Sequence, residues 1–489
     1  MSAFNASQLT NLALLTDLYQ LTMAYGYWKA GVSDREAVFH LYFRENPFDG
    51  GFAVACGLEP IINLLIDFHF DDSDVEYLRT LTGNDGKPLF DRAFLGELRQ
   101  LRLSCDIDAT PEGTTVFPHE PLIRVRGPIA QCQILETPLL NTINFQTLIA
   151  TKAARLRIAA GAEPILEFGL RRAQGIDGAL AASRAAYVGG CNATSNILAG
   201  KLYGIPVRGT HAHSWVMCFE SELEAFQAYA DAMPNNCIFL VDTYDTLAGV
   251  GNAIEIGRRL KEGGHRMVGI RLDSGDLAYL SIEARRMLDE AGFPDAVIVA
   301  SNDLDENIVQ SLKEQGAKIT VWGVGTKLAT AYDQPAMGGV YKLSAVRPPG
   351  GAWEHKVKLS EQAIKVSNPG VQQVRRFRRD GEYIADAIYD ELTGIDDDCT
   401  IVDPLDMMRR KRIPAGTRFE DLLVPVFRGG RCVYESPSIG HMRACAAASL
   451  AGFHSGVKRF IHPHQYPVGL DTRLHELKTR LVLQARGMA

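Results

Sequence analysis

The sequence predicts an α/β protein built around a parallel sheet, and three observations lead to this class. Short, nearly continuous apolar runs alternate with amphipathic helical segments through the middle of the chain. That pattern is typical of parallel strands covered by helices. A polar cluster follows almost every run, and the intervals between runs are short, as in a βα-barrel or a doubly wound sheet.

The segment 1–140 is predicted to form an N-terminal α+β domain. Residues 37–48 are rich in aromatic and β-branched side chains and are expected to form a strand, and residues 57–68 have a helical pattern. Residues 114–135 are strand-rich but are interrupted by Pro and Gly. A helical segment at 137–161 then leads into the middle of the chain.

The middle segment, 141–346, is expected to hold the parallel sheet and the active site. Its predicted strands lie within 164–172, 205–215, 237–246, 266–276, 296–303 and 318–326, with 338–346 as a candidate seventh. The carboxyl ends of parallel strands open onto one face, so the polar groups that follow them are expected to converge. These groups are Arg171, Arg172, His211, His213, Asp242, Asp245, Asp273, Asp276, Asn302, Asp303 and Gly323 to Thr326.

The segment 347–489 is predicted to be β-rich and to end in helices, after a Pro- and Gly-rich boundary at 348–351. The arginines within 375–379 are expected to form an exposed strand that resists edge pairing. The expected strands lie at 356–360, 363–368, 372–389 with a turn at Asp380–Gly381, and 422–435, and the expected helices lie near 441–453 and 470–486.

Composition excludes several classes of protein. The 489 residues carry 51 Lys and Arg against 58 Asp and Glu, a net charge of −7, which does not suit general binding of nucleic acid. The sequence contains no run of 18 apolar residues, so neither a membrane-spanning helix nor a membrane partner is expected. The first 23 residues lack the basic start that is typical of a secretory signal. We therefore expect a cytoplasmic protein.

The nine cysteines are scattered and form no CxxC pair. This spacing indicates reduced thiols rather than disulfides or a zinc site. Each cysteine is expected to be a small buried apolar side chain.

Two motifs at strand ends suit phosphorylated ligands. Gly323-Val324-Gly325-Thr326 lies between a strand and a helix, where backbone N–H groups can approach a phosphate, although an ordinary tight turn has the same pattern. Asp273-Ser274-Gly275-Asp276 suits ribose hydroxyls or a hydrated magnesium ion. Asp276 or Ser274 could instead cap the next helix, and Asp242 and Asp245 invite the same two readings.

Arginine and histidine pairs complete the candidate site. Arg171 and Arg172 follow Phe168, so a guanidinium could bind a carboxylate or phosphate beside an aromatic wall, or the pair could simply be solvated. His211 and His213 alternate along a strand-like segment and are expected to face the same side. One of them could act as a nucleophile or base, and a buried structural histidine is the alternative.

Eight ordered motifs resemble the nicotinate phosphoribosyltransferase family over nearly the whole chain. They are LLTDLYQLTM, YFRENPF, EFGLRRAQG, GTHAHSW, VDTYDT, RLDSGD, WGVGT and GGVYKL. The resemblance implies an irregular parallel α/β barrel of the type II phosphoribosyltransferase kind, with an N-terminal α+β domain and a β-rich C-terminal region. It also implies a homodimer with active sites at the subunit interface.

The implied reaction joins nicotinate and phosphoribosyl pyrophosphate to give nicotinate mononucleotide and pyrophosphate. ATP is hydrolysed as a co-substrate, Mg²⁺ is the implied cofactor, and the step begins NAD salvage from nicotinate. The resemblance does not assign the metal ligands.

The resemblance also implies roles for individual residues. His213 would be phosphorylated by ATP, whereas His211 has no counterpart in relatives. Phe168 and Arg171 would bind the pyridine ring and its carboxylate. Tyr19 of the second subunit would form the other wall of the pyridine site, and Asp17 would orient its segment. Arg271, Asp273 and Asp242 would contact ribose, pyrophosphate and magnesium, and Asn302 would contact ribose. The phosphate contacts would be Gly323, Gly325 and Thr326 for the 5′-phosphate, and Lys358 and Ser360 for further phosphate groups.

Three alternatives stay open on sequence alone. Nicotinamide phosphoribosyltransferase shares the FG-x-R and D-SG motifs, although the extra charge of Arg172 favours an acid over an amide. The other phosphoribosyltransferase architecture is disfavoured, since IFLVDTYDTLAG lacks its adjacent acidic pair. A non-catalytic relative is disfavoured by the intact motifs.

Overall fold

In the computed structural model, residues 12–488 are described and form two compact units. One unit contains residues up to 148 together with residues from 336 onward, and the other is the continuous segment 149–335. The segments 1–140 and 347–489 therefore contribute to one unit rather than to two. Residues 1–11 lie outside the described part of the chain, and they include the start of the segment that lacks a secretory signal pattern.

The unit built from both ends of the chain contains a seven-stranded sheet. Its order is β13-β12-β1-β5-β3-β19-β20, and all its pairings are antiparallel. The strands are β1 (Glu36–Tyr42), β3 (Asp106–Ala109), β5 (Ile123–Pro128), β12 (Val340–Arg347), β13 (Glu354–His355), β19 (Val424–Arg428) and β20 (Arg431–Cys432). The candidate seventh parallel strand is therefore wrong: β12 pairs antiparallel with β1 in this sheet.

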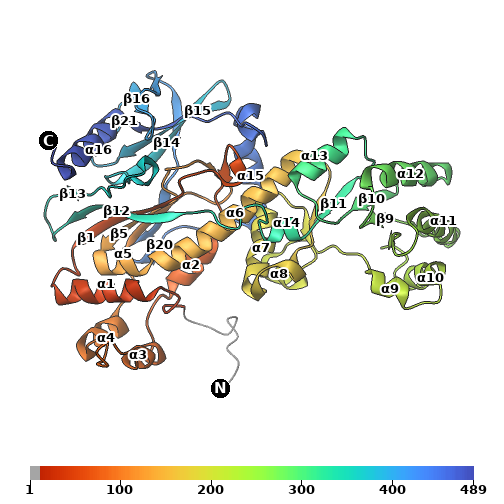
Figure 1. Ribbon diagram of the computed structural model, residues 1–489, viewed down its shortest axis with the longest axis horizontal. Coiled ribbons are helices and arrows are strands. Elements are labelled where there is room, and N and C mark those ends of the chain that lie inside the picture. Colours follow the sequence, from red (N-terminus) through yellow and green to blue (C-terminus); the bar gives the residue numbers. More distant parts are fainter. Residues whose placement is uncertain (1–11, 489) are drawn as a thin grey trace. The chain divides into compact units, whose positions relative to one another are not determined.

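A second sheet of six strands confirms the β-rich C-terminal region (Figure 1). Its order is β17-β16-β21-β15-β14-β18. The strands are β14 (Gln372–Arg379), β15 (Glu382–Asp390), β16 (Cys399–Val402), β17 (Arg410–Ile413), β18 (Arg418–Asp421) and β21 (Val468–Asp471). The expected strands at 356–360 and 363–368 are wrong: the first has no regular structure, and the second contains the 3-10 turn Ala363–Lys365.

The arginine run on β14 is not an exposed edge. β14 lies between β15 and β18, and Arg376 is only 1% exposed. Its guanidinium pairs with Asp386 at 2.5 Å and lies over the rings of Tyr383 and Phe453. The prediction of a solvated charge run is therefore wrong for Arg376, because a partner carboxylate on the neighbouring strand makes its burial favourable.

Helices cover the sheets of this unit, and a two-stranded sheet pairs β2 (Ala53–Val54) with β4 (Thr115–Val116). One of these helices, α6, begins in this unit and continues past residue 148 into the other unit. The helices are α1 (Leu18–Lys29), α2 (Leu58–Ile66), α3 (Asp72–Arg79), α4 (Arg92–Gln100), α5 (Ile129–Ile134), α15 (Ile439–Ala451), α16 (Thr472–Ala485) and α6 (Glu136–Ala160).

The segment 149–335 contains the predicted parallel sheet. Its order is β7-β6-β11-β10-β9-β8, with every pairing parallel. The strands are β6 (Ile165–Glu167), β7 (Ala193–Thr194), β8 (Ile238–Leu240), β9 (Gly269–Leu272), β10 (Val297–Ala300) and β11 (Val321–Val324). The expected strand at 205–215 is reduced to one bridge, in which Val207 pairs with Thr194 of β7.

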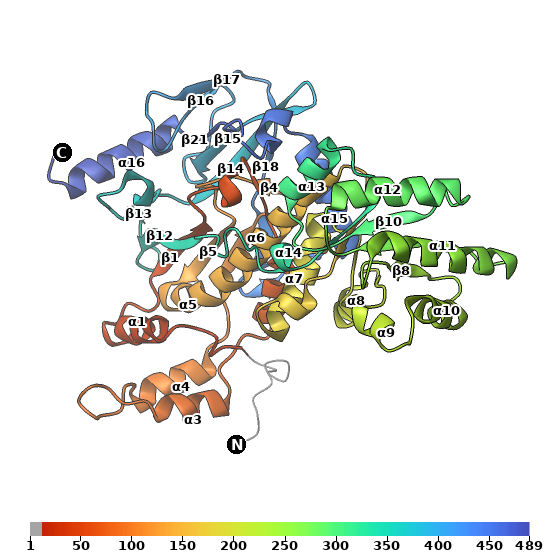
Figure 2. The ribbon, with the colours of Figure 1, turned by 45° about the vertical axis from the view of Figure 1, so that its right-hand side comes forward.

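Amphipathic helices follow these strands as the sequence predicts. Figure 2 shows α11 and α12 running alongside the strands. Side chains of Asp245, Asp276 and Asp305 cap α11, α12 and α13, which satisfies N–H groups at each helix start. The helices are α7 (Gly175–Gly189), α8 (Ile197–Tyr203), α9 (His213–Met217), α10 (Glu222–Ala232), α11 (Thr246–Glu262), α12 (Leu277–Glu290), α13 (Glu306–Glu314) and α14 (Thr326–Ala329).

All nine cysteines lie in the described part of the chain and are free thiols. Cys218 and Cys432 are exposed and Cys445 is half-buried, so burial of every cysteine is wrong for these three. Between residues 12 and 488, none of the helices combines the length and apolar character that crossing a lipid bilayer requires.

Candidate active site

Arg271, near the end of β9, holds several parts of the candidate site together. Its guanidinium donates to Ser301 at 2.8 Å, to Thr210 at 3.1 Å and to Asp273 at 2.9 Å. It also lies 5.6 Å from the centre of the Phe168 ring. One side chain therefore connects the ends of β6, β9 and β10 with the loop before α9.

Asp273 forms the acidic centre beside Arg271. Burial by itself raises the pKa of Asp273, but the hydrogen bond from Ser301 and the charge of Arg271 outweigh burial and lower that pKa. Its Oδ2 lies 3.7 Å from Nε2 of His213. The carboxylate is thus ionised next to the histidine that the sequence singles out.

Asp242 follows β8 and faces the same group. Its Oδ2 accepts hydrogen bonds from the backbone N–H of Asp273 at 3.0 Å and from the hydroxyl of Ser274 at 2.5 Å. Its Oδ1 is buried and has no hydrogen-bond partner. An ionised oxygen without a partner is a candidate ligand for a cation or a substrate hydroxyl.

His213 is the first residue of α9, and its Nδ1 lies 3.1 Å from the hydroxyl of Thr243. Its side chain is 40% exposed, whereas His211 is buried among aromatic rings. The two histidines therefore do not face the same side, and that expectation is wrong. Only Val207 of this segment forms a sheet bridge, and His213 already begins α9, so strand alternation does not relate the two histidines.

Phe168 forms a flat wall next to this acidic centre. Its backbone N–H donates to the carbonyl of Val324 at 2.8 Å, which places the residue at the end of β6 beside β11. A Cβ atom at Gly323 would lie 2.8 Å from the Phe168 ring. Gly323 lies within β11 and makes room for the ring by lacking a side chain.

Glu167 anchors the turn that follows Phe168, and the sequence analysis missed it. It is 1% exposed and accepts hydrogen bonds from the hydroxyls of Ser183 at 2.9 Å and Thr194 at 2.6 Å. It also accepts from the N–H of Gly169. A charged residue inside an otherwise apolar strand is the signal that could have found it.

Arg171 and Arg172 lie in a single 3-10 turn, Leu170–Arg172, and both are exposed. The Arg171 guanidinium donates only weakly, at 3.5 Å, to the carbonyl of Phe168. Among the described residues, no carboxylate forms an ion pair with Arg171. Its charge is available to an anion at the edge of the Phe168 ring.

The phosphate motif and Asn302 follow the next two strand ends. Gly325 precedes α14, and Thr326 is the first residue of that helix. Asn302 and Asp303 both adopt left-handed backbone conformations, with φ of 90° and 45°, in the turn after β10. Lys327 pairs with Asp305 and Asp333, each at 3.3 Å, and so ties α14 to the start of α13.

Tyr19, Asp17, Lys358 and Ser360 belong to the other unit. Tyr19 is 48% exposed on α1, and burial, with the charges of Glu136 and Asp17, raises its pKa. Asp17 accepts a hydrogen bond from Thr137 at 2.9 Å.

Three hydroxyl residues in the site, Thr210, Thr243 and Ser301, were also missed by sequence reasoning. Thr210 and Thr243 lie inside the motifs GTHAHSW and VDTYDT, and Ser301 directly precedes the predicted site residue Asn302. Their signal was position at a strand end. Short polar side chains there serve to orient the charged groups.

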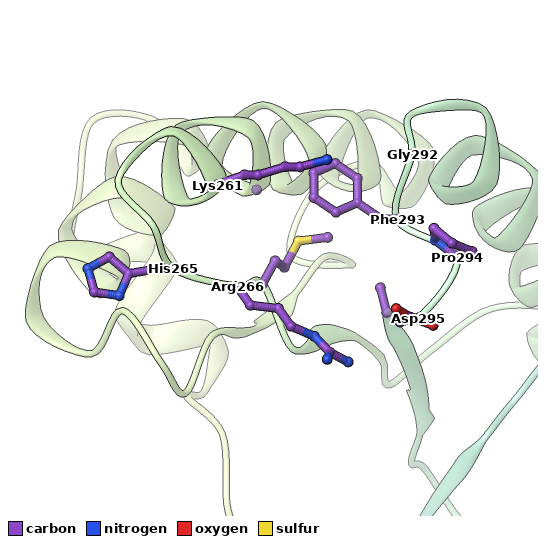
Figure 3. A pocket seen from close by; sticks show the side chains of 10 residues that line it. Lys261, His265, Arg266, Gly292, Phe293, Pro294 and Asp295 are labelled. Carbon is purple, nitrogen blue, oxygen red and sulfur yellow. The ribbon is translucent and has the colours of Figure 1, made fainter.

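Two hollows lie toward the amino ends of the strands, and the larger one reaches Thr210, whose hydroxyl accepts a hydrogen bond from Arg271. One, of about 600 Å³, is lined largely by apolar side chains such as Leu166, Val299 and Val321. The other, of about 280 Å³, lies beside the residues that precede β9 and β10, and Figure 3 shows Lys261 next to the Phe293 ring at its rim. Neither contains the Asp242 and Asp273 carboxylates.

The described residues contain no group of three or more His, Cys, Asp or Glu side chains that could hold a metal ion. Asp242 and Asp273 nevertheless suit magnesium, which commonly binds one or two carboxylates and completes its shell with water and substrate phosphates. The donor set therefore fits a metal that arrives with a phosphorylated substrate.

The fold and the site define an α/β enzyme whose charged groups gather at the carboxyl ends of parallel strands. Comparison with known proteins is more specific. Models of the nicotinate phosphoribosyltransferase N-terminal domain, family and C-terminal domain match residues 14–144, 164–357 and 372–478.

Relatives match along almost the entire chain. The nicotinate phosphoribosyltransferase of Bacillus subtilis is 44% identical, over 96% of this chain and 97% of its own. The human nicotinate phosphoribosyltransferase is 36% identical, with 96% of both chains covered. The crystal structure of human nicotinic acid phosphoribosyltransferase superposes with a TM-score of 0.83 at 34% identity, over 95% of this chain and 99% of that one. This chain belongs to the nicotinate phosphoribosyltransferase family.

Proposed function

We propose that the chain transfers the phosphoribosyl group of phosphoribosyl pyrophosphate to nicotinate, forming nicotinate mononucleotide and pyrophosphate with coupled hydrolysis of ATP. The reaction is the first step of NAD salvage from nicotinate. The observation that carries the proposal is the double contact of Arg271, which touches the Phe168 ring and the Asp273 carboxylate. It joins a flat surface for a base to an acidic site for a sugar phosphate.

The base binds against Phe168, and its carboxylate pairs with Arg171. The Phe168 ring is only 8% exposed and is held by Gly323 and Arg271, so the base stacks on the small part of the ring that stays open. The exposed guanidinium of Arg171 provides the fork geometry that suits a carboxylate. Tyr19 of the second subunit supplies the opposite wall.

The ribose and pyrophosphate bind at the ends of β8 and β9. Departure of pyrophosphate leaves positive charge on the ribose ring, which the ionised Asp273 stabilises. Asp242 and Asp273 hold Mg²⁺ together with the substrate phosphates, and the bound ion neutralises charge on the leaving group. Gly323, Gly325 and Thr326 bind the 5′-phosphate, and Asn302 contacts the ribose.

ATP phosphorylates His213. The Thr243 hydroxyl orients the imidazole, and Asp273 lies beside the other ring nitrogen. A phosphoryl group on His213 adds negative charge near the magnesium and pyrophosphate, which couples ATP use to ordered substrate binding. Lys358 and Ser360 contact phosphate groups of the substrates.

The parallel sheet closes as an irregular barrel, and two chains form a homodimer with shared active sites. In the observed strand order, each strand lies beside the one that would neighbour it in a closed barrel, except that β7 and β8 do not pair. Val207, which bridges to β7, lies on the side of β7 where this gap would close. The described α1 exposes an apolar stripe, Leu18, Tyr19 and Met23 at 51%, 48% and 38%. Stripes of this kind mark subunit interfaces.

The test is an assay with phosphoribosyl pyrophosphate and Mg²⁺, with nicotinate or nicotinamide, and with or without ATP. We expect mononucleotide and pyrophosphate from nicotinate only, with ATP raising the yield. Product chiefly from nicotinamide would overturn the base assignment and leave the fold unchanged. Absence of product from both bases would favour a non-catalytic relative.

A further inference from the structure

Among residues 12–488, β8 pairs with β9, and no other strand pairs with the outer edge of β8. Val241, the residue after β8, donates its backbone N–H to the carbonyl of Arg271 in β9 at 3.2 Å. Backbone groups alternate sides along a strand, so the N–H of Leu240 points away from β9. At a sheet edge such a group needs another acceptor.

His211 supplies that acceptor with its side chain. Its Nε2 lies 3.2 Å from the N–H of Leu240. The ring is 8% exposed and packs against Tyr229 and Phe226, with ring centres 4.9 Å and 6.0 Å away. Because Nε2 accepts, the neutral ring carries its proton on Nδ1.

The same loop carries His213 and is held at three points. Thr210 accepts from Arg271 at 3.1 Å, His211 accepts from Leu240 at 3.2 Å, and His213 contacts Thr243 at 3.1 Å. The contact of His211 is the middle one of the three along the loop, and its partner Leu240 is the last residue of β8, two residues before Asp242.

We propose that His211 is a positioning residue that joins the His213 loop to β8 in place of a missing strand, and so sets His213 against Thr243 and Asp273. The inference rests on the proposed phosphorylation of His213. Its effect belongs to the ATP-dependent step, since the contact orients the residue that receives the phosphoryl group.

Two substitutions separate the hydrogen bond from the packing. His211→Phe keeps an aromatic ring in the cluster but removes the acceptor, whereas His211→Gln places an amide oxygen close to the position of Nε2. Tyr229→Phe is the matched control, because it alters the same cluster without touching the acceptor. All three are assayed as the full chain.

We expect His211→Phe to lower the rate of His213 phosphorylation by labelled ATP, and the ATP-stimulated turnover, about tenfold, the effect of one lost hydrogen bond. The KM for nicotinate should change less than twofold. His211→Gln should recover most of the loss, and Tyr229→Phe should match the parent. Unchanged phosphorylation in His211→Phe, or a loss that Gln does not recover, overturns the proposal.

Hydrogen exchange at the Leu240 amide tests the contact without any reaction. It should be slow in the parent and in His211→Gln, and faster in His211→Phe; equal rates in all three would exclude the contact. His213→Ala distinguishes the two proposals. If that variant keeps full stimulation by ATP, the proposed role of His213 fails, while the exchange rates still report whether His211 binds β8.

Discussion

Single side chains in this site perform more than one task, and Arg271 is the clearest case. It contacts a base wall, a carboxylate and two hydroxyls from four segments of the chain. The planar, five-donor guanidinium makes this arrangement possible, and an ammonium group cannot reproduce it. The family resemblance indicated that Arg271 belongs to the site, but not that it joins Phe168 to Asp273.

Arg271→Lys should therefore be strongly impaired although the charge is retained. We expect kcat/KM for phosphoribosyl pyrophosphate to fall about a hundredfold, because two or more charge-assisted hydrogen bonds are lost. Steady-state kinetics with each substrate varied in turn will measure it. Arg172→Lys, at an exposed position in the 3-10 turn, is the control and should stay within a few-fold.

Gly323→Ala should act mainly on the base, because the phosphate contact proposed for Gly323 uses its backbone N–H, which alanine retains. The added Cβ would lie 2.8 Å from the Phe168 ring and would displace it, so the KM for nicotinate should rise about tenfold or more. The KM for phosphoribosyl pyrophosphate should change little. Gly178→Ala on α7, where no atom lies within 4 Å of the new Cβ, is the control. Equal changes in both KM values would contradict this role.

His119 predicts how stability depends on pH. Burial, together with Lys478 and Arg44, lowers the pKa of His119 to about 4. The unfolded chain takes up this proton near pH 6.5 and the folded chain only near pH 4. The contribution of His119 to stability is therefore complete above pH 6.5 and falls as the pH drops toward 4, by up to about 1.4 kcal/mol per pH unit.

His119→Asn should flatten this acid-side slope in denaturant unfolding curves recorded between pH 7 and pH 4. Asn suits the site because His119 has a positive φ of 70°, a conformation that Asn tolerates. His462→Asn is the control, because His462 is exposed and has a similar φ of 46°. If both variants keep the parent slope, His119 does not control it.

At the scale of secondary structure elements, most of the expected strands form, but 356–360 and 363–368 do not and 205–215 is reduced to one bridge, and the pairing of a strand was harder to predict than its existence. Val340–Arg347 has the apolar content of a strand, yet it pairs with β1, about 300 residues earlier, rather than with β11. Local sequence favours extended structure, whereas pairing depends on contacts distant in sequence. The convergence of Asp242 and Asp273 was predictable because parallel strands impose it.

The buried pair of Arg376 and Asp386 joins β14 to β15 and predicts a large stability effect. Asp386→Asn removes the charge that balances a guanidinium with 1% exposure. We expect a loss of about 3–5 kcal/mol, read from denaturant unfolding. Asp398→Asn breaks an exposed pair with Arg412 and should leave the unfolding midpoint unchanged. A small effect of Asp386→Asn would mean that Tyr466 or Glu120 compensates.

At the scale of the whole molecule, subunit sharing has a direct test. Tyr19→Ala and Arg171→Ala should each be nearly inactive, because each lacks one part of the base site. If active sites are shared, mixing the two variants under conditions of subunit exchange should restore part of the activity, through mixed dimers with one intact site. A mixture that stays inactive while mixed dimers form would contradict sharing.

The two units also differ in when their strands become available during synthesis. All six strands of the parallel sheet emerge by residue 324, whereas β1 and β3 must wait for β12 and β19, and Arg428 meets Asp108 across 320 residues. The segment 149–335 can therefore fold on the ribosome while β1 and β3, although both can pair with β5, each still lack a second neighbour. Until β12 emerges, β1 exposes one unpaired edge, and chaperones that shield nascent chains have a long task there.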